Sequence, residues 1–325
     1  MSYSPSFYPF HYKTIDYAGL FPPAELSFDE AIKNYAKYRV DTTDSWMLSR
    51  FIIPYKKLSE LVNYKSMLME NPPFAFSVLG GITDTTNEFK KDLDLLLFSI
   101  DNIVSTIGNK NISVESLELK IPILQDILFI LNIISDALSK FDTKVPLEIY
   151  LEFNLSQKHN DDLKLILRHI KDFNFNNKNP KIKFIGYKVR TGGLEPKAFP
   201  SVDKLASVIF ECSNFGVQLK ATAGLHHPIR HYNSSVQTHM YGFINVIGAC
   251  VLTAIHKLNF DTICDILIDE EPANFKFTDQ KFIWGKFEAS KEQIEFSRSK
   301  SFIAFGSCSF DEPRDDLESL GLYKH

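Results

Sequence analysis

The feature that most constrains this chain is an alternation of short apolar segments with longer amphipathic segments, which recurs eight times. The short segments are rich in β-branched and aromatic residues, as is typical of buried strands, whereas the longer ones have apolar residues at helical spacing. Parallel strands need helical crossovers of this length. The pattern therefore predicts an α/β protein in which eight strands close into a (β/α)8 TIM barrel.

The expected strands cover residues 12–19, 46–54, 74–81, 114–122, 145–154, 182–190, 217–223 and 301–310. The expected helices cover residues 28–40, 56–65, 85–107, 124–140, 158–173, 201–216 and 241–258, with a short one after the last strand. Ser27 and Glu30 have the spacing of a capping box before the first of these helices. An open doubly wound sheet would share the alternation, but no G-x-G-x-x-G motif follows the first strand.

We therefore expect one barrel domain over residues 1–325. The gap before the last strand is longer than one helix needs, which indicates an enlarged helical insertion at about 225–300. We expect extra helices and a short hairpin there, which would cover the carboxyl mouth of the barrel or make a subunit contact in a homo-oligomer.

Composition excludes some classes of partner. The formal net charge is -4, and no long run of lysine and arginine occurs, so nucleic-acid binding is not expected. The most apolar run, residues 121–138, is interrupted by Gln125, Asp126 and Asp136, which favours a buried helix over a membrane span. The N-terminus lacks the basic and apolar regions of a signal peptide. These features predict a cytoplasmic protein without membrane association.

The four cysteines are scattered and have neither C-x-x-C nor zinc-finger spacing. Such cysteines are most often small buried apolar residues of a reducing compartment. Cys308 is the one nearest to the expected site.

Polar side chains gather where the expected strands end. Lys188 and Arg190 are two residues apart, so strand alternation sends them to the same side of the sheet, and Lys220 with Thr222 repeats this arrangement one crossover later. Other strand ends have Asp16, Arg50, Glu118, Lys120, Glu152 and the segment Ser307–Ser309. Barrel enzymes place their chemistry at the carboxyl ends of the strands, so we expect the site there. A structural layer of ion pairs inside the barrel is the alternative.

The residue types suggest chemistry on a small anionic carbonyl compound, such as a sugar phosphate or a keto acid. A lysine beside another cation has a lowered pKa and can act as a nucleophile, so Lys188 could form an imine with Lys220 as its neighbour. Glu118 and Glu152 complete the expected catalytic set as proton-transfer groups. Guanidinium groups bind carboxylate or phosphate well. The expected substrate-binding residues are Asp16, Arg50, Lys120, Arg190, Thr222, His226, His227 and Arg230.

Two other functions fit the same residues. His226, His227 and His231 could hold a divalent metal for hydrolase or lyase chemistry, although Pro228 interrupts the segment. The charged mouth could also bind an anionic metabolite without turnover. The imine interpretation needs no cofactor, whereas the histidine interpretation needs a divalent metal.

Two resemblances accompany these residues. The segments Lys188–Gly193 (KVRTGG) and Lys220–Gly224 (KATAG) resemble the paired lysine motifs of class I aldolases of the deoxyribose-phosphate aldolase type, which form a Schiff base. This resemblance implies that Lys188 is the imine-forming residue and Lys220 its neighbour; Arg190 departs from it, because that family has a small residue there. Over nearly its full length the chain resembles an uncharacterised bacterial protein family with the motifs KxRTGG and KATAGLHHP, which implies no particular activity.

Overall fold

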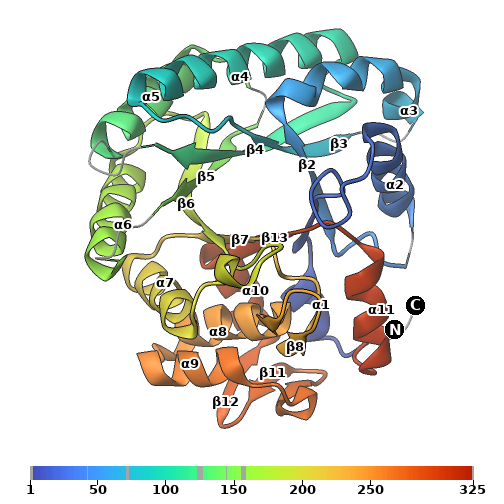
Figure 1. Ribbon diagram of the computed structural model, residues 1–325, viewed down its shortest axis with the longest axis vertical. Helices are drawn as coiled ribbons and strands as arrows, with labels where there is room; N and C mark the ends of the chain where they lie inside the picture. The colour runs from blue at the N-terminus through green and yellow to red at the C-terminus, as the bar shows by residue number, and fades with distance from the viewer. Residues whose placement is uncertain are drawn as a thin grey trace. The chain divides into compact units, whose positions relative to one another are not determined.

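The computed structural model of the protein describes residues 3–41, 43–70, 73–122, 127–143, 145–154 and 159–323. Eight parallel strands form a closed barrel in the order β1-β13-β7-β6-β5-β4-β3-β2 (Figure 1). These strands are β1 (Ile15–Tyr17), β2 (Leu48–Pro54), β3 (Phe74–Leu79), β4 (Ile112–Ile121), β5 (Leu147–Phe153), β6 (Ile182–Arg190), β7 (Leu219–Thr222) and β13 (Phe302–Ser307). The prediction of a TIM barrel is confirmed.

The chain forms two compact units. The β2–β6 unit contains residues Ser27–Ala36 and Arg50–Lys188. The β1–β7–β13 unit contains residues Met1–Leu26, Lys37–Ser49 and Val189–His325.

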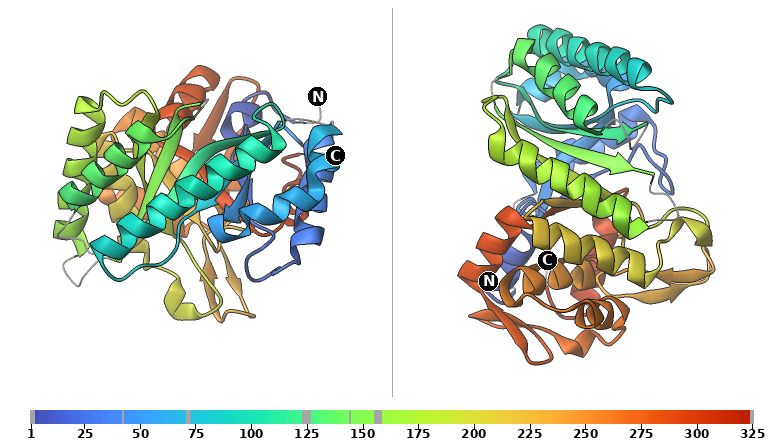
Figure 2. Two further views of the ribbon diagram at one scale, coloured as in Figure 1. Left: turned by 90° about the horizontal axis from the view of Figure 1, so that it is seen from above. Right: turned by 90° about the vertical axis from the view of Figure 1, so that its left-hand side faces the viewer.

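Helices cover the outer side of the strands in the β2–β6 unit. Its long helices are α4 (Thr86–Ile107), α5 (Ile127–Lys140) and α6 (His159–Asn176), which Figures 1 and 2 show along β3 to β6. Each has a buried apolar stripe, and α4 begins at a capping box formed by Thr85 and Glu88. The expected starts of the second and third of these helices, at 124 and 158, lie outside the described residues.

The capping box predicted at Ser27 is present before α2 (Phe28–Val40). The Glu30 backbone N–H donates to the Ser27 hydroxyl at 3.2 Å, and the Ser27 backbone N–H donates to the Glu30 carboxylate at 3.1 Å. The predicted α-helix at 56–65 is wrong in type: a 3-10 helix covers Tyr55–Tyr64, and the α-helix α3 (Lys65–Glu70) follows it. The buried residues there are spaced by three, the period of a 3-10 helix: Tyr55, Leu58 and Leu61.

The β1–β7–β13 unit contains the remaining α-helices, besides two short 3-10 helices at Pro196–Ala198 and Pro272–Asn274. The α-helices are α1 (Phe7–His11), α7 (Val202–Phe215), α8 (Phe243–His256), α9 (Phe260–Ile268), α10 (Lys291–Lys300) and α11 (Asp311–Ser319). Helix α8 contacts α7, α9 and α10, which explains why almost all of its side chains are apolar and buried.

The segment before the last barrel strand is mixed, so the prediction of an enlarged helical insertion is not confirmed, although extra helices and a short hairpin are present there as expected. Besides α8, α9 and α10 it contains a hairpin, β8 (His231–Asn233) with β9 (Thr238–Met240). A three-stranded antiparallel sheet follows, made of β10 (Phe275–Phe277), β11 (Lys281–Trp284) and β12 (Phe287–Ser290). Within the described ranges no helix has both the length and the apolar composition needed to span a membrane.

Asn245 joins three segments of the β1–β7–β13 unit and is fully buried. Its amide donates to the carbonyls of Ile266 and Asp269, both at 2.8 Å, and its oxygen accepts the Arg230 backbone N–H at 2.9 Å.

Asn245→Ala leaves these three backbone groups without partners, so we expect a loss of roughly 3 kcal/mol or more in the free energy of unfolding, measured by urea denaturation. Asn259 caps α9, and Asn259→Ala should cost only about 1 kcal/mol.

Candidate functional site

Lys188 lies between two carboxylates in the β2–β6 unit. Its Nζ is 2.8 Å from Oε2 of Glu118 and 3.1 Å from Oε2 of Glu152. Lys188 and Glu118 are buried, with 7% and 3% of their surface exposed, while Glu152 is partly open. This group of three, the Lys188 cluster, brings together three of the four residues predicted as catalytic.

The strand register explains how these residues meet. Glu152 is paired with Lys188 across β5 and β6, and Lys120 is paired with Glu152 across β4 and β5. Glu118 is two residues before Lys120, so it lies on the same face of β4 one pleat nearer the amino end. Lys120 itself is partly exposed.

Two serines that the sequence analysis missed complete the surroundings of Glu118. The Ser77 hydroxyl donates to Oε1 of Glu118 at 2.6 Å, and the Ser116 hydroxyl donates to that of Ser77 at 2.7 Å. Both serines are fully buried. Their hydrogen bonds fix Oε1 of the Glu118 carboxylate, and Oε2 faces Lys188. In the sequence, the two serines could have been identified by their alternating positions in strands that are otherwise apolar.

The protonation of Lys188 differs from the expectation. Burial would lower the pKa of this ammonium, but the negative charges of Glu118 and Glu152 outweigh burial and hold the pKa above its ordinary value. The neighbours of Lys188 within its unit are thus anions, and the lowered pKa predicted from a neighbouring cation is wrong for the free protein. Lys188 is an ammonium ion at neutral pH.

Arg50 belongs to a different group in the same unit. It lies in the first half of β2, and its guanidinium contacts Glu115 at 3.0 Å and Glu148 at 2.9 Å. Glu148 also accepts from Lys183 at 2.8 Å and from Tyr150 at 2.9 Å. Glu148 is the second residue of β5, so this cluster lies near the amino ends of the strands, where barrels place residues that stabilise the fold.

Asp16 and Lys220 form an ion pair in the β1–β7–β13 unit, and both are fully buried. They come from β1 and β7, which flank β13. A buried charge that loses its partner destabilises a protein strongly, so this pair fixes the two strands to each other. Asp16 was predicted to bind substrate and Lys220 to take part in catalysis; both roles stay predictions.

The glycines of the two lysine motifs have a structural reason. A Cβ on Gly192 would lie 2.8 Å from the Cα of Gly224, and Gly224 has a φ of +73°. The Thr191 backbone N–H donates to the Thr222 carbonyl at 2.9 Å, which holds the two loops together. The shared K-x-x-x-G pattern therefore reflects close packing of the loops after β6 and β7. Arg190 is exposed and Thr222 partly exposed.

The predicted histidine loop is not helical, and its side chains face acids. His227 Nδ1 lies 2.5 Å from Asp316, and its ring contacts that of His231 with centroids 4.4 Å apart. His226 Nδ1 lies 3.4 Å from Glu312. Arg230 contacts Glu270 at 3.4 Å. Within the described parts of the chain no three or more His, Cys, Asp or Glu side chains are arranged to hold a metal.

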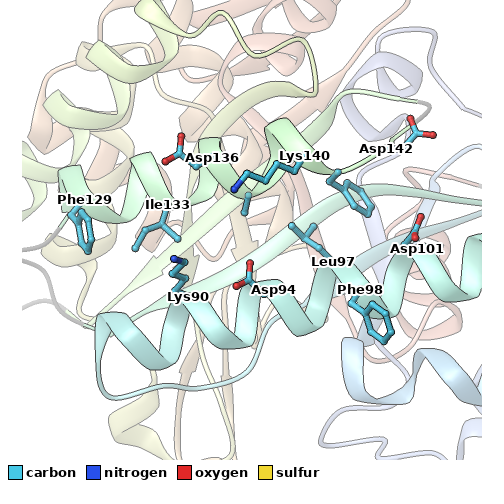
Figure 3. Close-up of a pocket in the computed structure, with 12 residues that line it drawn as sticks. Lys90, Asp94, Leu97, Phe98, Asp101, Phe129, Ile133, Asp136, Lys140 and Asp142 are labelled. Carbon is cyan, nitrogen blue, oxygen red and sulfur yellow. The ribbon is translucent and has the colours of Figure 1, made fainter.

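Two hollows on the described surface lie away from these groups. One of about 610 Å³ lies between α4 and α5, and Figure 3 shows Lys90 and Asp94 of the first helix and Ile133 and Lys140 of the second along it. Another, of about 210 Å³, lies among α7, α8 and α10. Neither is lined by a residue predicted for the site.

The search for similar proteins matches neither a protein-family model nor a curated protein.

The Lys188 cluster should show the behaviour of a buried ion pair. Lys188→Met leaves the charge of Glu118 without its partner and should lower the free energy of unfolding by about 3 kcal/mol or more, measured by urea denaturation. Adding Glu118→Gln removes the unpaired negative charge and should recover much of the lost free energy of unfolding. Lys183→Met, at an exposed lysine of the same strand, is the control and should cost about 1 kcal/mol or less. An equal loss in the single and double variants would contradict this account.

Glu148 should contribute to acid sensitivity. Burial would raise the pKa of this carboxyl, but the charges of Arg50 and Lys183 hold it below its ordinary value. A lowered folded-state pKa contributes stability above the unfolded-state value of about 4.3, and this stability is lost as the pH falls through the folded-state pKa. Between about pH 5 and pH 3 the unfolding free energy of Glu148→Gln should therefore fall less steeply than that of the natural protein, as urea titrations at each pH would reveal.

Proposed function

We propose that the protein is an enzyme of the lyase type that binds a small anionic carbonyl compound through an imine on Lys188. The observation that carries this proposal is the position of the Lys188 amine between two carboxylates, inside a barrel strand and two residues before the carboxyl end of β6. Strand residues at this end of a barrel are the ones that meet substrate. The resemblance of residues 188–193 to class I aldolases also supports Lys188 as the imine-forming residue.

The two carboxylates supply the proton transfers that imine formation needs. One carboxylate takes a proton from the Lys188 ammonium, and the neutral amine attacks the carbonyl carbon to give a carbinolamine. The same carboxyl group returns the proton to the carbinolamine hydroxyl, which leaves as water. The product is an iminium ion, so a positive charge again lies between Glu118 and Glu152. A site that stabilises the ammonium therefore also stabilises the iminium.

The partly open Glu152 is the better candidate for this proton transfer. Glu118 has one oxygen fixed by Ser77 and is nearly inaccessible, which suits a permanent counter-charge. Glu152 is partly exposed and can approach a bound substrate. The role of Arg190 in binding the anionic group of the substrate stays a prediction from its residue type.

A non-catalytic anion-binding barrel is less well supported. The buried cations Arg50, Lys188 and Lys220 all have carboxylate partners. Their charges are thus largely neutralised before any ligand arrives. A metal-dependent reaction at the histidine loop lacks a ligand set in the described residues.

Reductive trapping tests the imine directly. The protein is incubated with a pool of keto acids and sugar phosphates, borohydride is added, and modified peptides are mapped by mass spectrometry. We expect an adduct on Lys188 that is absent from Lys188→Met and retained in Lys183→Met. Trapping should become faster as the pH rises above neutrality, because the raised pKa of Lys188, held up by Glu118 and Glu152, keeps the neutral amine scarce. An adduct confined to Lys220, or none with any carbonyl compound, would overturn the assignment.

A further inference from the structure

A thiol, an imidazole and a carboxylate meet at the end of the last barrel strand in the β1–β7–β13 unit. The Cys308 Sγ, directly after β13, lies 3.7 Å from Nδ1 of His226, in the loop after β7. Oε2 of Glu312, in the first turn of α11, lies 3.4 Å from the same nitrogen. Cys308 and His226 are 7% and 8% exposed. The Lys188 cluster does not include any of them.

The imidazole is charged at neutral pH. Burial would lower the pKa of His226, but its contacts with Cys308 and Glu312 raise the pKa to about 9. The pKa of Glu312 is lowered below its ordinary value, above all by its hydrogen bond with His226. A cation in contact with a cysteine sulfur stabilises the thiolate, which is the nucleophilic form.

We propose that Cys308 is a reactive thiol, a modification site for small hydroperoxides, with His226 as its proton donor. The thiolate attacks one peroxide oxygen and forms an S–O bond while the O–O bond breaks. His226 gives its ring proton to the departing hydroxide or alkoxide, which leaves as water or as an alcohol. The sulfur is oxidised to a sulfenic acid and the peroxide is reduced, so charge and atoms balance. A nearly closed site of this kind admits a small oxidant and excludes large ones.

The other three cysteines lack this arrangement. Burial raises the pKa of the thiols of Cys212 and Cys250. Cys264 is the most accessible of the four, yet burial and the neighbouring acids Asp203, Asp261 and Asp265 raise the pKa of its thiol. Exposure alone therefore favours reaction at Cys264, whereas the charged imidazole favours Cys308. The two explanations predict opposite orders of reaction within one molecule.

The experiment compares these two sites in the full-length protein. The natural chain is treated with hydrogen peroxide below stoichiometry, sulfenic acid is captured with dimedone, and labelled peptides are quantified by mass spectrometry. We expect label on Cys308 to exceed that on Cys264 by roughly tenfold. Label that appears first on Cys264 would overturn the proposal, and this result needs no variant that must fold.

Two histidine variants separate the imidazole from general effects of mutation. His226→Gln should lower the Cys308 to Cys264 ratio by roughly tenfold and leave Cys264 unchanged as the internal reference. His239→Gln is the control, at a histidine of the same unit whose ring lies 3.2 Å from Glu270. It should preserve the ratio. An unchanged ratio in His226→Gln would assign the reactivity of Cys308 to something other than its histidine.

Discussion

The compensation of buried charge is the constraint on which this structure depends. An ion that leaves water for a protein interior loses several kcal/mol of solvation, which only a close partner and further hydrogen bonds restore. The barrel strands contain Arg50, Lys188 and Lys220, and acidic residues on other strands compensate all three. Glu152 and Lys188 are register partners on the adjacent strands β5 and β6, whereas the other pairs join strands that are not neighbours in the barrel. A slip by one residue would turn each charge toward an apolar face.

The same constraint separates two levels inside the β2–β6 unit. Arg50 and Glu148 lie near the amino ends of their strands and have further partners in Glu115 and Lys183. Lys188 and Glu152 lie within two residues of the carboxyl ends of theirs. A barrel uses the first level for stability and the second for chemistry. Arg50 thus belongs by its position to the stabilising level, although its residue type alone suggested a role in substrate binding.

The sequence was sufficient for the architecture because strand and helix periods differ so clearly. The eight expected strands correspond to the eight barrel strands, and the strand at 182–190 has the predicted bounds. Local signals also identified the capping box at Ser27. The 3-10 helix after β2 was missed because a spacing of three in Tyr55, Leu58 and Leu61 is easily taken for the 3.6-residue period of an α-helix.

The contacts of the site depend on pairing between distant strands, which a single sequence does not contain. Alternation indicated that Lys188 faces inward, but its partners follow from the registers of β4, β5 and β6. One register shift between Phe76 and Ser77 in the β3–β4 pair also changes which residues of β4 face the interior beyond that point. A neighbouring cation and a neighbouring anion were both compatible with the sequence. They have opposite effects on the pKa of Lys188, so the inference about its protonation required the structure.

A raised pKa does not by itself argue against a nucleophilic lysine. The ammonium and the iminium carry the same charge on the same nitrogen, so the carboxylates that hold the first also favour the second, and only the short-lived neutral amine between them is disfavoured. Glu152, which accepts from Lys188 and is partly open to solvent, can remove the proton at the moment of attack. The buried Glu118, fixed by Ser77 and Ser116, keeps the counter-charge in place throughout. The division between one fixed and one accessible carboxylate is what distinguishes this cluster from the fully buried Asp16–Lys220 pair, in which no group is free to exchange protons with a ligand without opening the barrel wall.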